Sequence, residues 1–156
     1  MCQTPHLLVG AALGILSQNS VCAFSLGFVS HLVLDLVPHY DIASHYGKHK
    51  HDYFIVIFCA LDLLLGCFLV ACFLYHRPYD MRLLAFWGAL GSFILDFLDI
   101  VLANYLFPSL RQTLIGRACH WLHTTFHSHD YNHYWYLGIM TQVLTCGISM
   151  AVMYFL

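Results

Sequence analysis

The residues with the clearest capacity for chemistry are two histidines and two aspartates between positions 31 and 41. His31 and Asp35 are four positions apart, so on a helix they lie on one face, about a turn from each other. Pro38 cannot continue a helix, and therefore His39 and Asp41 fall just beyond its end, where the chain can fold back over it. Imidazoles and carboxylates gathered in this way are typical ligands of a divalent metal ion.

A second group of histidines lies in the C-terminal third of the chain. His120, His123 and His127 follow an i, i+3, i+7 pattern, which places them on one stripe of a helix. Histidines three or four positions apart can bind the same metal ion. The predicted metal ligands are His6, His31, Asp35, His39, Asp96, His123 and His127. Asp41 or Asp99 is the predicted general base, or the group that orients a ligating histidine.

These polar residues lie in a very apolar chain. Of its 156 residues, 60% are hydrophobic and only 9% are charged, whereas soluble proteins are about 45–50% apolar and about 25% charged. The core of a domain of this size cannot hide that excess, because much of its surface stays in contact with solvent. We therefore expect an integral membrane protein with the lipid bilayer as its main surroundings.

The apolar runs predict an all-α membrane bundle of about four or five helices, forming a single domain over residues 1–156. The expected helices cover residues 5–16, 21–37, 53–75 and 83–107, followed by an interfacial helix within 109–133 and a last span within 134–156. The first is only about 18 Å long, short of the roughly 30 Å hydrocarbon core, so it spans poorly or forms half of a helical hairpin. Gly10 and Gly14 give it a small face for close packing against another helix.

Alternate threading of these helices places residues 38–52 and 108–133 on the same side of the membrane. Their lysines and arginines outnumber those of the opposite loop, which favours a cytoplasmic position for this histidine-rich face. Asp62 and Asp96 lie about 14–16 Å below their helix ends. An ionisable group at that depth costs at least about 2.5–3.5 kcal/mol unless it is paired or faces water. A cavity that opens on the histidine-rich face and is lined by these residues would offset this cost, and a bound divalent cation would offset more. Asp62 could instead hydrogen-bond a neighbouring helix.

The composition and the missing motifs exclude several classes of function. Only six residues are Lys or Arg, so no basic face exists to hold nucleic acid. The sequence contains no glycine-rich phosphate loop, no G-x-S-x-G elbow, no H-E-x-x-H helix and no C-x-x-C-H haem site.

Several stretches together resemble a known family. They are Thr4-Pro-His6 with the short Ala/Gly-rich helix after it, the Ser-His-x-x-x-Asp-x-x-Pro-His-x-Asp pattern at 30–41, the glycine-rich run at 88–96 and the histidines at 120–127. This pattern is similar to small prokaryotic inner-membrane proteins described as membrane-bound metal-dependent hydrolases. The resemblance covers most of the chain and is most specific at 30–41. It implies a compact bundle of membrane helices in the inner membrane with a metal-supported hydrolytic site. Where such families usually have Pro-Asp, this chain has Leu95-Asp96.

Three functions remain open on these observations. A hydrolase would use a divalent metal, with Zn²⁺ favoured by the His/carboxylate mixture, to activate water against a lipid headgroup or phosphoester. A metal-ion or proton-coupled transporter would use Asp62 and Asp96 as part of an ion pathway. The helix halves near residues 76–82 are almost wholly apolar. This favours a site that opens on one side of the membrane over an ion pathway that crosses it. A non-catalytic membrane subunit with a structural metal is the third reading.

Overall fold

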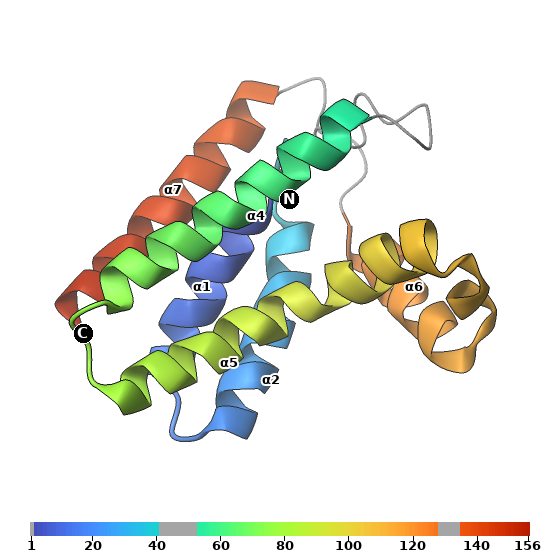
Figure 1. Cartoon of the computed structure of the whole chain (residues 1–156). Coiled ribbons are helices and arrows are strands. Elements are labelled where there is room, and N and C mark those ends of the chain that lie inside the picture. Colours follow the sequence, from blue (N-terminus) through green and yellow to red (C-terminus); the bar gives the residue numbers. More distant parts are fainter. Residues whose placement is uncertain (1, 41–52, 128–134) are drawn as a thin grey trace.

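The computed structural model describes residues 2–40, 53–127 and 135–156. Over these ranges the chain is all-helical and contains no β-strand, which confirms the predicted fold class there (Figure 1). The elements are α1 (Gln3–Ile15), α2 (Ser20–Leu36), α4 (Tyr53–Leu74), α5 (Tyr79–Asp96), the π-helix η1 (Phe97–Leu106), the 3₁₀-helix η2 (Pro108–Gln112), α6 (Leu114–Phe126) and α7 (Trp135–Phe155).

Helices α1 and α2 form a helical hairpin, one of the two arrangements that the short first apolar run allows. Asn19 caps α2 by accepting a 2.9 Å hydrogen bond from the backbone N–H of Cys22. At the other end, Val37 has extended backbone angles because it precedes Pro38, and α2 ends at Leu36. The hairpin therefore brings the first turn of α1 near the last turn of α2.

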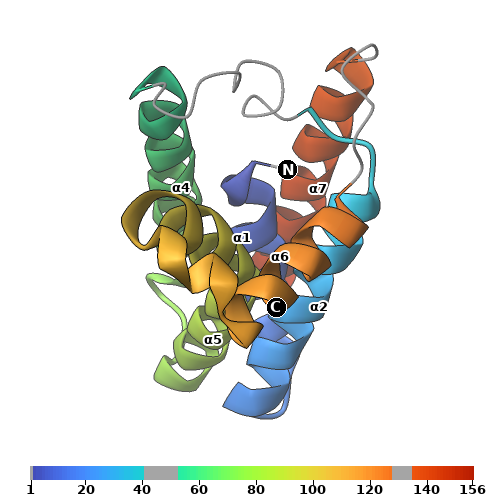
Figure 2. The same cartoon turned by 90° about the vertical axis from the view of Figure 1, so that its right-hand side faces the viewer.

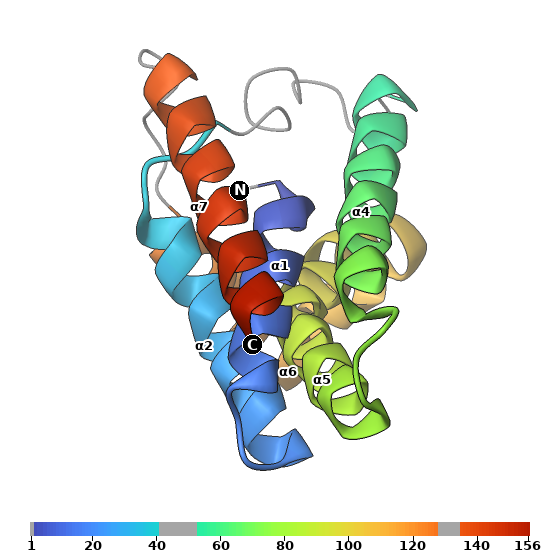
Figure 3. The same ribbon diagram turned by 90° about the vertical axis from the view of Figure 1, so that its left-hand side faces the viewer.

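Helix α1 lies at the centre of the bundle. It packs against α2, α4, α5 and α7, with α4 on the side away from α2 and α7 (Figure 3). Its apolar residues supply half of the main buried core, which consists of Leu8, Ala11, Ala12, Leu74, Ala85 and Met153. The shortest of the predicted spans is thus the helix around which the others are arranged.

Small residues allow this close packing. A Cβ atom on Gly88 would overlap the backbone carbonyl oxygen of Gly10, and a Cβ on Gly10 would overlap that of Gly88. A Cβ atom on Gly27 of α2 would overlap the same carbonyl oxygen of Gly88. The predicted small face of α1 is confirmed, and α5 carries its counterpart.

Three helices are long and apolar enough to cross a membrane: Val56–Leu74 with 19 residues, Tyr79–Ala103 with 25 and Trp135–Phe155 with 21. Leucine and phenylalanine side chains cover the outer face of α4, where Leu64 and Phe68 are each 64% exposed. Helix α2 is apolar but shorter. The number of helices that cross a bilayer stays a prediction.

The expected helix over residues 83–107 differs from the structure at both ends. It begins earlier, at Tyr79, directly after Pro78, and from Phe97 to Leu106 it continues as a π-helix. After η2, Thr113 caps α6 by accepting a 3.1 Å hydrogen bond from the N–H of Gly116. Helix α6 packs beside α2, α5 and η1, on the side of the bundle away from α7 (Figure 2). A helix before the last span is therefore confirmed, and its position at a membrane surface remains a prediction.

Candidate metal centre

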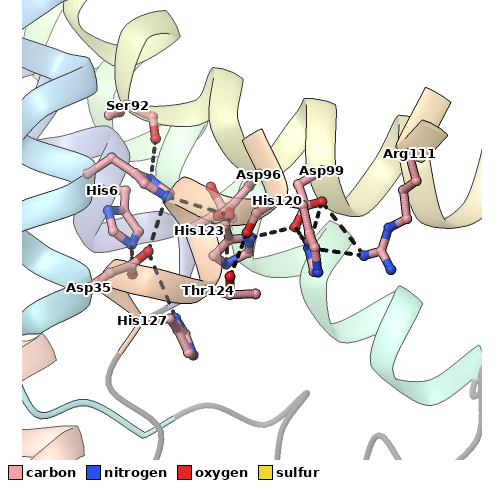
Figure 4. Close-up of polar contacts among 12 residues, drawn as sticks. His6, Asp35, Ser92, Asp96, Asp99, Arg111, His120, His123, Thr124 and His127 are labelled. Carbon is pink, nitrogen blue, oxygen red and sulfur yellow. Dashed lines mark hydrogen bonds and ion pairs between the residues drawn. The ribbon is translucent and has the colours of Figure 1, made fainter. Parts of the chain in front are cut away.

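Polar side chains from five elements of the fold meet between the first turn of α1 and the last turn of α2 (Figure 4). Helix α1 contributes His6, and α2 contributes His31 and Asp35. Asp96 ends α5, and Asp99 lies in the first turn of η1. Helix α6 approaches from the side and adds its histidine stripe. Residues more than a hundred positions apart in the sequence, such as His6 and His127, thus form one cluster.

The innermost group is His6, His31 and Asp35, all at most 2% exposed. Each offers a ligand atom, and the three atoms lie within 4.8 Å of one another. The Nε2 atoms of His6 and His31 are each 3.2 Å from an oxygen of Asp35. The two imidazole rings stack with their centroids 4.3 Å apart. Since two imidazolium rings would repel each other at that distance, the stack favours at most one charged ring.

His31 is held in a defined orientation. Its Nδ1 donates a 2.7 Å hydrogen bond to the carbonyl oxygen of Ser92. In a neutral ring this leaves the lone pair on Nε2. Nε2 lies 3.2 Å from Oδ2 of Asp35 and 3.6 Å from Oδ1 of Asp96. It is buried and makes no hydrogen bond within the described part of the chain. A lone pair facing two carboxylates is unfavourable unless a cation lies between them.

A second group shares Asp35 with the first. Asp35, His123 and His127 also offer ligand atoms within 4.8 Å of one another. Nδ1 of His127 is 3.9 Å from Oδ2 of Asp35. Nε2 of His123 is 3.6 Å from Oδ1 of Asp96. Both histidines are 15% exposed, so this group lies nearer the surface than the first.

Asp99 contacts the far side of the His123 ring. Nδ1 of His123 donates a 3.0 Å hydrogen bond to Oδ2 of Asp99, so Nε2 faces Asp96. His120 and Arg111 contact the same carboxylate at 3.3 Å and 3.6 Å. A carboxylate that fixes a histidine in this way commonly orients metal ligands. Of the two roles predicted for Asp99, the geometry favours orientation.

His39 lies at the edge of the cluster, where its ring meets that of His127 edge-on at 4.9 Å. Nδ1 of His39 donates a 2.8 Å hydrogen bond to the carbonyl oxygen of Val37. Burial lowers the pKa of His39 to about 4, which keeps this ring neutral near neutral pH. Asp41, the other predicted general base, lies outside the described residues.

Asp62 does not join the cluster. Its carboxylate accepts hydrogen bonds from the backbone N–H groups of Gln3 and Thr4 and, at 2.7 Å, from the hydroxyl of Thr4. A side chain of α4 therefore caps the N-terminus of α1, where unsatisfied N–H groups favour a negative charge. Of the two readings of this residue, the structure favours the hydrogen bond to a neighbouring helix.

The site includes residues that the list of predicted ligands omits. His120 belongs to the i, i+3, i+7 stripe, and that pattern signals its place beside Asp99. Gln3, whose side-chain amide donates to Asp96, and the carbonyl of Ser92 carry no such signal, because their positions depend on how α1, α2 and α5 pack. Arg111 is likewise placed only by the turn through η2.

All seven predicted metal ligands lie in this region, with His39 at its edge. Comparison with protein-family models, with curated proteins and with solved structures gives no significant match. The function must therefore be argued from the site itself.

Proposed function

We propose that this chain is a membrane-embedded metal-dependent hydrolase with a His/Asp site near one membrane face. The observation that carries the proposal is Nε2 of His31, which is buried between two carboxylates while Nδ1 donates to a carbonyl. A divalent cation between these groups would bind the histidine lone pair and cancel carboxylate charge. The position of Nε2 supports metal binding directly. It supports hydrolysis only through the chemistry that a bound metal ion would supply.

A proton on His31 is the simplest competitor of a metal ion. It would make His31 an imidazolium between Asp35 and Asp96. However, Nε2 makes no hydrogen bond to either carboxylate among the described residues, and His6 Nε2 faces the same Asp35 from a stacked ring. A proton serves one ring, whereas a metal ion binds both nitrogens at once. The arrangement of the two histidines around Asp35 therefore fits a metal ion better than a proton on His31.

The nature of the donors favours Zn²⁺, which binds neutral imidazole and carboxylate and, when bound, supplies hydroxide near neutral pH. Asp35 and the histidines around it would hold the ion. Asp99 would fix the ring of His123, with His120 and Arg111 holding Asp99 in turn. Asp41 stays a candidate for the proton-accepting base on its place in the sequence alone.

The apolar outer surface supports a membrane location and a lipid-level substrate. Helix α4, helix α5 continued by η1, and helix α7 are long enough to cross a bilayer. Helix α6, which carries the outer histidines, also exposes Leu114 and Trp121, 77% and 62% accessible. Lipid around these side chains would set the metal site near headgroup level, where lipid headgroups or other phosphoesters can reach it.

A transporter finds less support, because Asp62 already serves as the cap of α1. A structural metal site in a non-catalytic subunit shares the same ligands as the hydrolase. A measurement of hydrolytic activity therefore distinguishes the hydrolase from the non-catalytic subunit.

The test is hydrolysis by the full chain in lipid nanodiscs loaded with Zn²⁺. Substrates are bis-p-nitrophenyl phosphate and phosphatidylglycerol vesicles, beside a neutral p-nitrophenyl ester. We expect Asp35→Asn to lower the rate by about 100-fold or more, because it removes the shared ligand. Asp80→Asn, at an exposed site in the first turn of α5, is the matched control and should keep full activity. A metal-loaded wild type with no hydrolysis above the Asp35→Asn variant would refute the enzyme and leave a structural metal site.

A further inference from the structure

The six innermost donor residues exceed the four positions of one tetrahedral zinc ion, and we infer that the site holds two divalent ions bridged by the carboxylate of Asp35. This inference rests on the metal binding in the proposed function and not on its hydrolytic activity. The donors are His6, His31, Asp35, Asp96, His123 and His127. A tetrahedral zinc ion takes four ligands, and a hydrolytic one leaves one of these positions to water.

The donors divide into two sets with Asp35 in common. His6 and His31 form the inner set, and His123 and His127 form the outer set. Oδ1 of Asp35 is 3.2 Å from His6, while Oδ2 is 3.2 Å from His31 and 3.9 Å from His127. The Asp35 carboxylate thus contacts histidines of both sets, as a bridging ligand requires.

Asp96 lies between the same two sets. Its Oδ1 is 3.6 Å from Nε2 of His31 and 3.6 Å from Nε2 of His123. Both buried carboxylates therefore contact inner and outer histidines at once. Paired metal ions about 3.5–4 Å apart, held in this manner, are common in enzymes that hydrolyse phosphoesters.

The two positions differ in their access to solvent. The inner histidines are both fully buried, whereas the outer histidines are each 15% exposed. The inner ion would have a closed environment, and the outer ion would have room for water and substrate. The structure assigns the reacting position to the outer set.

The charge balance identifies the class of substrate. Two divalent ions bring four positive charges, and Asp35 and Asp96 bring two negative ones. Asp99 is offset by Arg111 at 3.6 Å. The excess positive charge is balanced by a hydroxide and an anionic ligand, so a phosphoester fits the two-metal site better than a neutral carboxylic ester does.

Metal stoichiometry tests this directly. The full chain in nanodiscs is loaded with Mn²⁺ or Zn²⁺, desalted and measured by elemental analysis, with size-exclusion profile and helical circular dichroism as checks on folding. We expect about two equivalents in the wild type and about one in His6→Ala and in His127→Ala, since each variant removes a ligand of one ion only. Asp35→Ala should lose both ions. His76→Ala, an exposed histidine at the far end of α4, is the control and should keep about two equivalents.

Electron paramagnetic resonance of the Mn²⁺ form gives a second readout. An exchange-coupled spectrum in the wild type, replaced by an uncoupled one in either single variant, supports the bridged pair. One equivalent in the wild type that both His6→Ala and His127→Ala abolish would overturn the inference, while hydrolysis by that form would leave the proposed function intact. Two coupled ions without hydrolysis would support the inference and refute the enzyme. A folded wild type that binds no metal would refute both.

Discussion

The N-terminus of α1 offers a sharp test of the fold, through the substitution Asp62→Ala. The carboxylate of Asp62 accepts two backbone N–H groups and one hydroxyl at the start of α1. Without it, those N–H groups lie between helices with no acceptor in place. The Thr4 hydroxyl is less affected, because it also donates to the carbonyl oxygen of Asp62 at 2.8 Å.

The expected loss of stability follows from these contacts. Leaving a buried donor without a partner costs about 1–3 kcal/mol, and removing a helix cap costs about 0.5–2 kcal/mol. For two N–H groups at a partly exposed position we expect Asp62→Ala to lower the free energy of unfolding by about 2–4 kcal/mol. Asp62→Asn keeps one acceptor oxygen and should lose about half as much. Asp80→Ala, at an exposed helix start, should lose no more than about 1 kcal/mol.

The assay is equilibrium unfolding of the purified chain in mixed micelles, followed by circular dichroism as the fraction of denaturing detergent rises. Metal content and ion flux into proteoliposomes are measured on the same preparations. Unchanged stability in Asp62→Ala would refute the capping role. Metal flux by the wild type that Asp62→Asn abolishes at unchanged stability would restore the transporter hypothesis.

Three further predictions follow from the packing and the site. Gly88→Val should prevent a monodisperse fold, because its side chain would overlap the backbone of α1, while Gly147→Val, which meets nothing within 4 Å, should be tolerated in size-exclusion chromatography. Asp99→Asn should weaken metal binding by about 10–100-fold in competition with a chelating dye, because it loosens the orientation of His123. In metal-free protein, lowering the pH from 6.5 to 5 should reduce the free energy of unfolding by on the order of 1–2 kcal/mol through His39. The pKa of His39 is about 4 in the folded chain and 6.5 in the unfolded chain, so the unfolded chain binds the proton first as the pH falls. His39→Asn should remove this part of the pH dependence, and an unchanged slope would contradict the assignment.

Helical phase made part of the site predictable from the sequence. His31 and Asp35 share a face at i, i+4, and Pro38 ends their helix, so their convergence needs only local geometry. The stripe of His120, His123 and His127 follows from the same periodicity. Site residues that lie on the same face of one helix can therefore be predicted from their spacing in the sequence.

Contacts between helices could not be read in this way. The cap of α1 by Asp62 joins residues 58 positions apart, and the bond from His31 to Ser92 spans 61. The central position of α1 was also not predicted, since its length suggested a weak span. Only the small residues Gly10 and Gly14 indicated that another backbone comes close. The π-helix after Asp96 has no residue pattern that separates it from an α-helix.

The central position of α1 has a consequence for how the protein is made. Ribosomes synthesise α1 first among the described helices, yet the core that surrounds it includes Met153 of α7, the last of them. Until α7 emerges, α1 lacks one of the helices that pack against it. We expect a chain arrested before α7 to insert its earlier helices and remain a target for membrane quality-control proteases.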